Sequence, residues 1–341
     1  MTSTAPHSGH SGLGSDKRIS FSNLLEQDSQ TYSYSGTAPP LVASRYRFAH
    51  EPWQDANPPF AEPPIELTAP LLILPLGLLI WGWIPALAGV AVQAADTGEH
   101  FRLARKTVAV VAREGAVRSL VRLLRPFGRD GDPVRTEVAE PRNGALPVLL
   151  VPSPPANRAA MTFLAMFLTH RGLPWVHSIN VGKGTTLDAQ ATTIAEKAAK
   201  LAQCAGVDKI DVVAHGISGL AAAWWIRHLG GDAHVRRLIT IGTPWSGTRM
   251  AVFQRGTLAR TLLPGAAILD DLLPQNVPTI AIGSPTDPFV VPSCSAHPEG
   301  AVSVVLDGAG HTDLLISARA FRAVFTALSE PMGDSLPAEV S

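Results

Sequence analysis

Cysteine is scarce in this 341-residue chain, which has only Cys204 and Cys294. Two cysteines so far apart exclude a secreted disulfide framework and lack the close spacing of a zinc site. Charged residues are also scarce, since they make up only 16% of the chain. The 28 Lys and Arg residues are balanced by 28 Asp and Glu residues. The balance excludes the basic excess that nucleic-acid partners require. We expect no nucleic-acid partner, no cofactor and no metal ion.

Regular periodicity is absent from residues 1–65, which are rich in Ser, Thr, Gly and Pro. This composition predicts a disordered or extended segment. An early basic stretch followed by an apolar run, as in a signal peptide, is also missing.

Charged residues are absent from Leu67 to Ala95. A run of this length exceeds the roughly 20 apolar residues needed to cross a hydrocarbon core. Pro70, Pro75 and Pro85 are each expected to break or kink a helix. The run therefore predicts a membrane-embedded segment, and the alternatives are a broken hairpin in one leaflet or an arm packed on the rest of the protein.

A basic segment follows the apolar run, and Glu114 is nearly its only acidic residue. Apolar residues recur in it at helical spacing, which predicts a basic amphipathic helix on an anionic membrane surface. The alternative is a helix packed on the protein with a solvated basic face. Residues 66–127 are thus read as a membrane-associated helical region, and residues 128–144 as a polar linker. By the positive-inside rule, the C-terminal domain is expected to face the cytoplasm.

Strand-like and helix-like segments alternate through residues 145–332, before a short tail at 333–341. Such alternation predicts an α/β domain with a mostly parallel, doubly wound sheet covered by helices on both faces. Ligands of such sheets bind at the carboxyl ends of the strands. The expected strands are 147–151, 175–181, 209–214, 235–241, 277–283 and 301–306, and the expected helices are 159–171, 187–205, 220–229 and 314–328.

Five motifs in this domain follow one another in an order that resembles the bacterial lipase/esterase branch of the α/β-hydrolase fold. The motifs are VLLVPS (148–153), VVAHGISG (212–219), IGTPWSGT (241–248), IGSPTDPFVVP (282–292) and GAGHTDLL (308–315). The resemblance implies a strand–turn–helix elbow that carries the nucleophile, followed along the chain by an acid and then by a base.

Two of the three catalytic positions implied by the resemblance are filled. Asp287 matches the acid and His311 matches the general base. Gly216 stands where the elbow serine belongs and has no side chain that could attack a substrate. Ser218, two positions further on, is the alternative nucleophile, although a rotation of about 200° along a helix should turn it away from His311.

The resemblance also implies an oxyanion hole and an acyl pocket. The backbone N–H of Ile217 is one expected donor, and the second falls at Pro154, which has no N–H. A shift of one or two residues would offer Ser153 or Ala156 instead. Trp245 lies in the loop that shapes the acyl pocket in the family, and residues 249–275 are expected to form a lid.

Together these features predict a membrane-associated, lipase/esterase-like domain that is catalytically degenerate and binds a lipid or acyl-ester ligand. The alternative is an active esterase or lipase that uses a non-standard nucleophile such as Ser218.

Overall fold

The computed structural model describes residues 68–97, 105–129, 145–173, 175–182, 186–253 and 257–329. The expectations for residues 1–65, for the tail and for most of the linker lie outside these ranges. The principal helices are α2 (Thr68–Thr97), α3 (Arg105–Leu124), α4 (Thr162–His170), α5 (Leu187–Ala205), α6 (Ile217–His228), α7 (Thr257–Thr261) and α8 (Ala318–Ser329). The strands are β1 (Val148–Val151), β2 (Val176–Ser178), β3 (Ile210–His215), β4 (Val235–Ile241), β5 (Thr279–Gly283) and β6 (Val302–Val305).

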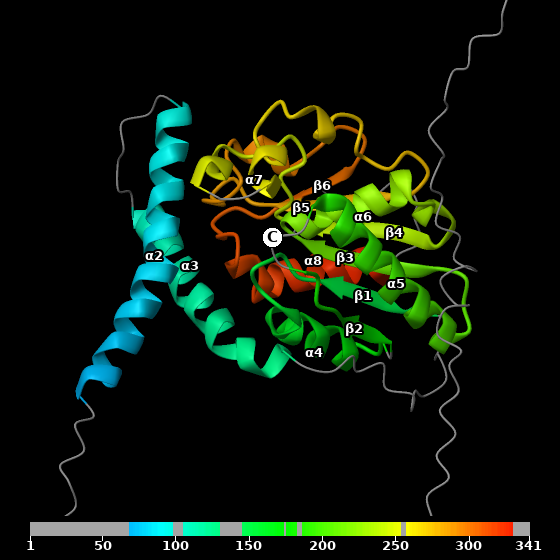
Figure 1. Ribbon diagram of the computed structural model, residues 1–341, viewed down its shortest axis with the longest axis horizontal. Coiled ribbons are helices and arrows are strands. Elements are labelled where there is room, and N and C mark those ends of the chain that lie inside the picture. The colour runs from blue at the N-terminus through cyan, green and yellow to red at the C-terminus, as the bar shows by residue number, and fades with distance from the viewer. Residues whose placement is uncertain are drawn as a thin grey trace, which may run out of the picture.

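The six strands form one parallel sheet in the order β2-β1-β3-β4-β5-β6 (Figure 1). Side chains alternate between its two faces, so Leu149 and Val151 join the core beneath α5 and α6, whereas Val148 and Leu150 join the core beneath α4 and α8. Covering of both faces explains why most residues of the central strands are apolar. The predicted α/β class, with a parallel sheet and helices on both faces, is confirmed.

The strand order reverses between β1 and β3. The chain leaves β1 for β2 at one edge and returns to place β3 on the other side of β1. Connections on opposite sides of the sheet separate at such a point, and open α/β sheets bind their ligands in the crevice this creates at the carboxyl ends of the strands. The loops that begin at Pro152 and Gly216 meet at this point.

The apolar segment forms one continuous helix, α2, so the prolines that were expected to break or kink a helix do not break it. Pro70 falls in the first turn, where a missing N–H leaves no intrahelical bond unmade. Within the described residues, no helix combines the length and hydropathy needed to cross a bilayer. The C-terminal part of α2 instead contacts the sheet domain, because Gln93 donates to the Pro285 carbonyl and Asp96 pairs with Arg249.

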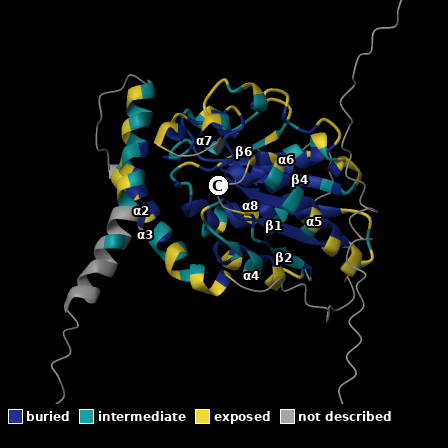
Figure 2. Ribbon diagram, in the orientation of Figure 1, coloured by how far each residue is buried: buried dark blue, intermediate teal, exposed yellow. Residues whose placement is uncertain are grey.

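The basic segment forms α3, which crosses α2 beside the sheet domain and is buried along one side (Figures 1 and 2). Val110, Val111 and Val117 are buried there, as is the carboxylate of Glu114. This arrangement corresponds to the alternative in which the helix packs on the protein. Arg122 is exposed, as is Arg113, which nevertheless reaches Asp313 of the sheet domain.

The segment predicted to form a lid contains the short helix α7 and two 3-10 turns, Arg249–Phe253 and Ala267–Leu269. Thr248 and Arg249 anchor its start, because their N–H groups donate to Leu262 and Val291. Val252 and Phe253 are largely exposed beside this anchor. Its action as a lid stays a prediction.

Candidate functional site

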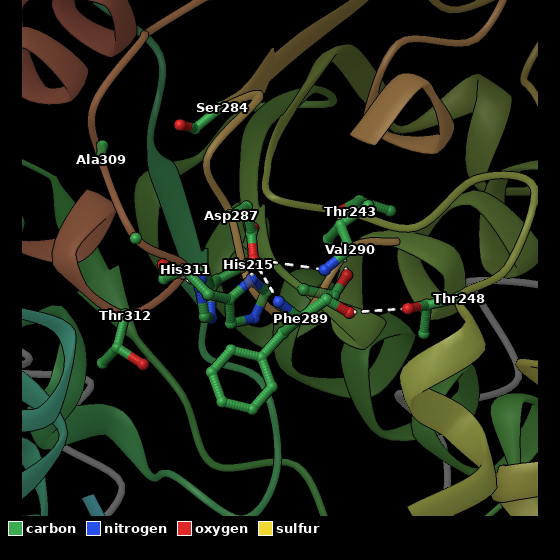
Figure 3. A network of polar contacts seen from close by, with 12 residues as sticks. His215, Thr243, Thr248, Ser284, Asp287, Phe289, Val290, Ala309, His311 and Thr312 are labelled. Atoms are coloured by element: carbon green, nitrogen blue, oxygen red, sulfur yellow. Dashed lines mark hydrogen bonds and ion pairs between the residues drawn. The ribbon is translucent and has the colours of Figure 1, made fainter. Parts of the chain in front are cut away.

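Asp287 and His311 form a hydrogen-bonded acid–base pair. Asp287 follows β5 and His311 follows β6, and the Asp287 Oδ2 atom lies 2.8 Å from His311 Nδ1 (Figure 3). The second carboxylate oxygen accepts hydrogen bonds from the N–H groups of Phe289 and Val290, at 2.7 and 3.2 Å. These bonds fix the carboxylate, which in turn orients the imidazole and favours the tautomer with its proton on Nδ1.

The imidazole of His311 is enclosed but reaches the surface, since 14% of its side chain is exposed. The rings of His215 and Phe289 lie 4.4 and 5.6 Å from it, centroid to centroid. Burial lowers the pKa of His311, but the carboxylates of Asp287 and Glu114 more than offset this, so the pKa is raised. His215 has the opposite shift, because burial and the neighbouring His311 hold its pKa well below the ordinary value.

Gly216 lies at the turn between β3 and α6, where the resemblance places the nucleophile, and it has no side chain. It lies between β3 and α6 with φ 53° and ψ −129°, a conformation that residues with a side chain adopt only at a cost of about 1–3 kcal/mol. A Cβ built on Gly216 would stand 3.2 Å from His311 Nε2. The structure thus brings position 216 to the acid–base pair.

Ser218 lies away from the acid–base pair. Its hydroxyl is fully buried and donates to the Pro152 carbonyl at 2.8 Å. This hydrogen bond ties the first turn of α6 to the loop after β1, and it points the oxygen into the seam between helix and sheet.

The expected oxyanion donors are only partly present. Ile217 is the first residue of α6, and the first N–H groups of a helix have no intrahelical acceptor. Pro154 joins Pro155 through a cis peptide bond and offers no N–H. The N–H of Ala156 already donates to the Ser153 carbonyl at 3.0 Å. Of the oxyanion donors expected in the loop after β1, only the N–H of Ser153 could therefore donate to a ligand.

Trp245 is 96% buried, since its exposed fraction is 4%. Its backbone N–H donates to the Ser295 carbonyl, whereas its indole Nε1 has no acceptor in the described part of the chain. No group of His, Cys, Asp and Glu side chains within the same residues is arranged to hold a metal ion.

Glu114 is a site residue that the sequence reasoning missed. This carboxylate comes from α3, is fully buried, and accepts hydrogen bonds from the N–H groups of Thr312 and Asp313 at 2.8 and 3.0 Å. Burial raises its pKa, although His311 acts against this shift. The available signal was a lone acidic residue at a helical position within a basic segment.

Arg118 follows Glu114 by one helical turn and also faces the site. Its guanidinium lies 4.5 Å from the centre of the Phe289 ring. Burial lowers its pKa, and Glu114 acts against that shift. The side chains of α3 therefore reach both the loop that carries His311 and the loop that carries Asp287.

Known structures with a similar fold include two lipases. A mature Bacillus licheniformis lipase matches with a TM-score of 0.50 at 15% identity, covering 56% of this chain and 95% of its own. Aspergillus fumigatus lipase B matches with a TM-score of 0.51 at 13% identity, covering 75% and 85%. No protein-family model matches the chain, and no curated protein matches it in sequence. At such low identity the comparisons establish the fold alone, which is the α/β-hydrolase fold.

Proposed function

We propose that this protein binds an acyl ester beside His311 and that its elbow has lost the nucleophile of an esterase. The proposal is supported by one observation. Asp287 and His311 are hydrogen-bonded next to a turn whose residue, Gly216, has no side chain. An elbow of this kind forms no acyl-enzyme at position 216.

The retained parts of the site suit an ester. The N–H of Ile217 begins α6, where the helix dipole favours partial negative charge such as that on a carbonyl oxygen. His311 Nε2 faces the same position and makes no hydrogen bond to any described residue, so it is available to a ligand. The Ser218 alternative gains no support, because its hydroxyl is used by Pro152.

Titration of the full-length protein with a medium-chain methyl ester, followed by NMR of histidine ring protons, tests ester binding. The resonances of His311 should shift in a saturable manner. His170 is the internal control, because it is exposed on α4 and its Nδ1 contacts only its own helix. Unchanged His311 resonances at saturating ester would refute the proposal.

We further propose that the protein acts at an anionic lipid surface. Exposed apolar side chains alternate with arginines near the end of α3, where Leu123 and Phe127 are 50% and 79% exposed and Arg122 is exposed beside them. Large apolar groups next to cations suit the boundary between headgroups and acyl chains. Placement on the cytoplasmic side remains a prediction from the same charges.

Co-sedimentation with vesicles of phosphatidylcholine and phosphatidylserine tests the lipid surface. The double variant Leu123→Glu/Phe127→Glu should bind at least about tenfold more weakly, since each lost apolar side chain contributes roughly 1.5–3 kcal/mol when buried. The matched variant Val302→Glu/Val305→Glu places the same charges on exposed positions of β6. Equal losses in both variants would contradict a site on α3.

A further inference from the structure

The hydroxyl of Ser153 occupies the space that a side chain at position 216 would take. A Cβ on Gly216 would stand 2.8 Å from Ser153 Oγ and 3.0 Å from Ser153 Cβ, as well as 3.2 Å from His311 Nε2. Ser153 Oγ and the imidazole of His311 therefore both lie next to the point where the Cβ would stand. A serine at 216 and the observed conformation of Ser153 exclude each other.

Strand pairing explains why these two residues meet. In the register between β1 and β3, Val151 is opposite Ala214. Two residues further along each strand, the chain reaches Ser153 and Gly216 at the carboxyl ends. The juxtaposition thus follows from the pairing of β1 with β3, and it lies at the point where the strand order reverses.

Of the hydroxyls of Ser153, Ser218 and Thr243, that of Ser153 makes the longest hydrogen bond. Its contact with the Pro154 carbonyl is long, at 3.4 Å, and spans adjacent residues. The hydroxyls of Ser218 and Thr243 are instead held at 2.8 Å by the carbonyls of Pro152 and Gly216. Ser153 can therefore turn about its side-chain bond at little cost, whereas the other two would each leave a buried carbonyl unpaired.

We propose that Ser153 serves as a displaced nucleophile for carboxylic esters, in place of the missing elbow residue. This proposal rests on the proposed binding of an acyl ester beside His311. Ser153 Oγ bonds to the ester carbonyl carbon while its proton passes to His311 Nε2. The carbon–alkoxy bond then breaks, and the departing alkoxide takes the proton from Nε2 and leaves as an alcohol. Water, deprotonated by His311, next attacks the acyl-Ser153 ester and releases a carboxylic acid and the free hydroxyl.

This arrangement predicts slow turnover. Ser153 reaches the site from the loop after β1, so its oxygen is offset from the position for which the Ile217 N–H is placed. A misplacement of about 1 Å costs on the order of 10²-fold in rate. The acyl-enzyme on Ser153 is therefore expected to form slowly.

Covalent labelling of the full-length protein tests the assignment. Incubation with a fluorophosphonate probe, or with p-nitrophenyl butyrate, should add one group per chain, and peptide mass spectrometry should locate it on Ser153. Ser153→Ala should abolish the adduct, and His311→Ala should slow its formation at least about 10²-fold. Ser303→Ala, on the edge strand β6, is the matched control and should label as the wild type does.

Ser153→Cys guards against a trivial loss of folding in the alanine variant. It should retain acylation by p-nitrophenyl butyrate, with a pH profile that follows the ionisation of His311. An adduct on Ser218, or no adduct on Ser153 in a protein whose His311 resonances respond to ester, would overturn the assignment and leave ester binding intact. Absence of both the adduct and the NMR response would remove both proposals.

Discussion

His311 Nε2 faces Gly216 across a distance of 3.2 Å, measured to the point where a Cβ would stand. The imidazole of His311 therefore faces a turn residue, Gly216, that has no side chain. Because Ser153 Oγ lies 2.8 Å from the same point, restoring a serine requires that Ser153 give way.

The double variant Gly216→Ser/Ser153→Gly should gain esterase activity. The glycine removes the colliding hydroxyl, and the new serine stands next to His311 on a backbone already shaped as an elbow. We expect hydrolysis of p-nitrophenyl butyrate about 10²-fold or more above the wild type, which is the scale of a well-placed general base. Gly216→Ala/Ser153→Gly has the same backbone with neither hydroxyl and should be inactive. Equal activity in the two variants would mean that the base does not serve position 216.

Gly216→Ala alone should destabilise the fold. The positive φ costs about 1–3 kcal/mol for a residue with a side chain. Contact with Ser153 adds to this cost. Gly206→Ala is the matched control, because Gly206 has φ 66° but open space around its Cα. Urea unfolding should show the larger loss at position 216, and adding Ser153→Gly should recover part of it.

Glu114→Ala should destabilise the fold by roughly 2–4 kcal/mol, because two buried N–H groups, those of Thr312 and Asp313, lose their acceptor. It should also lower the pKa of His311, which the Glu114 carboxylate raises. Arg113→Ala is the control: Arg113 contacts the same loop through Asp313 but is half exposed, so its loss should cost under about 1 kcal/mol. Histidine NMR and urea unfolding measure the two effects. An unchanged pKa of His311 in Glu114→Ala would reduce Glu114 to a structural role.

The pair between His311 and Asp287 should make stability depend on pH. Because the folded-state pKa of His311 is raised, the stabilisation is fully present below the unfolded-state value of about 6.5. It is lost as pH rises through the higher folded-state pKa. In Asp287→Asn this decline should shrink, since burial then opposes the charged imidazole. Unfolding free energies from pH 5.5 to 9 measure the difference, and parallel curves for the two proteins would contradict it.

The domain that carries the site could be predicted closely because its signals are local. Helix α5 begins and ends at the expected residues, with Thr186 capping its first turn and Gly206 in the left-handed conformation at its end. Strand β4 likewise has the expected bounds, Val235–Ile241, although it includes Arg236 and Arg237 near its start. The order of elbow, acid and base along the chain gave His311, Asp287 and Gly216.

Contacts between residues far apart in the sequence could not be predicted in this way, because no local sequence pattern marks them. Glu114 and Thr312 are 198 positions apart, and nothing in either neighbourhood marks the pairing. The approach of Ser153 to Gly216 depends on the register of two strands, which periodicity does not determine. The continuity of α2 through its prolines was missed because a local rule was applied to a helix that neighbouring elements support.

The buried carboxylate of Glu114 has a consequence for dissecting this protein. A fragment beginning at the first strand would contain every residue of the acid–base pair, yet the amides of Thr312 and Asp313 would face solvent where a helix now shields them. Such a minimal domain would keep the loop that carries His311 but lose the Glu114 carboxylate that holds this loop, so the residues before the first strand help to position the imidazole.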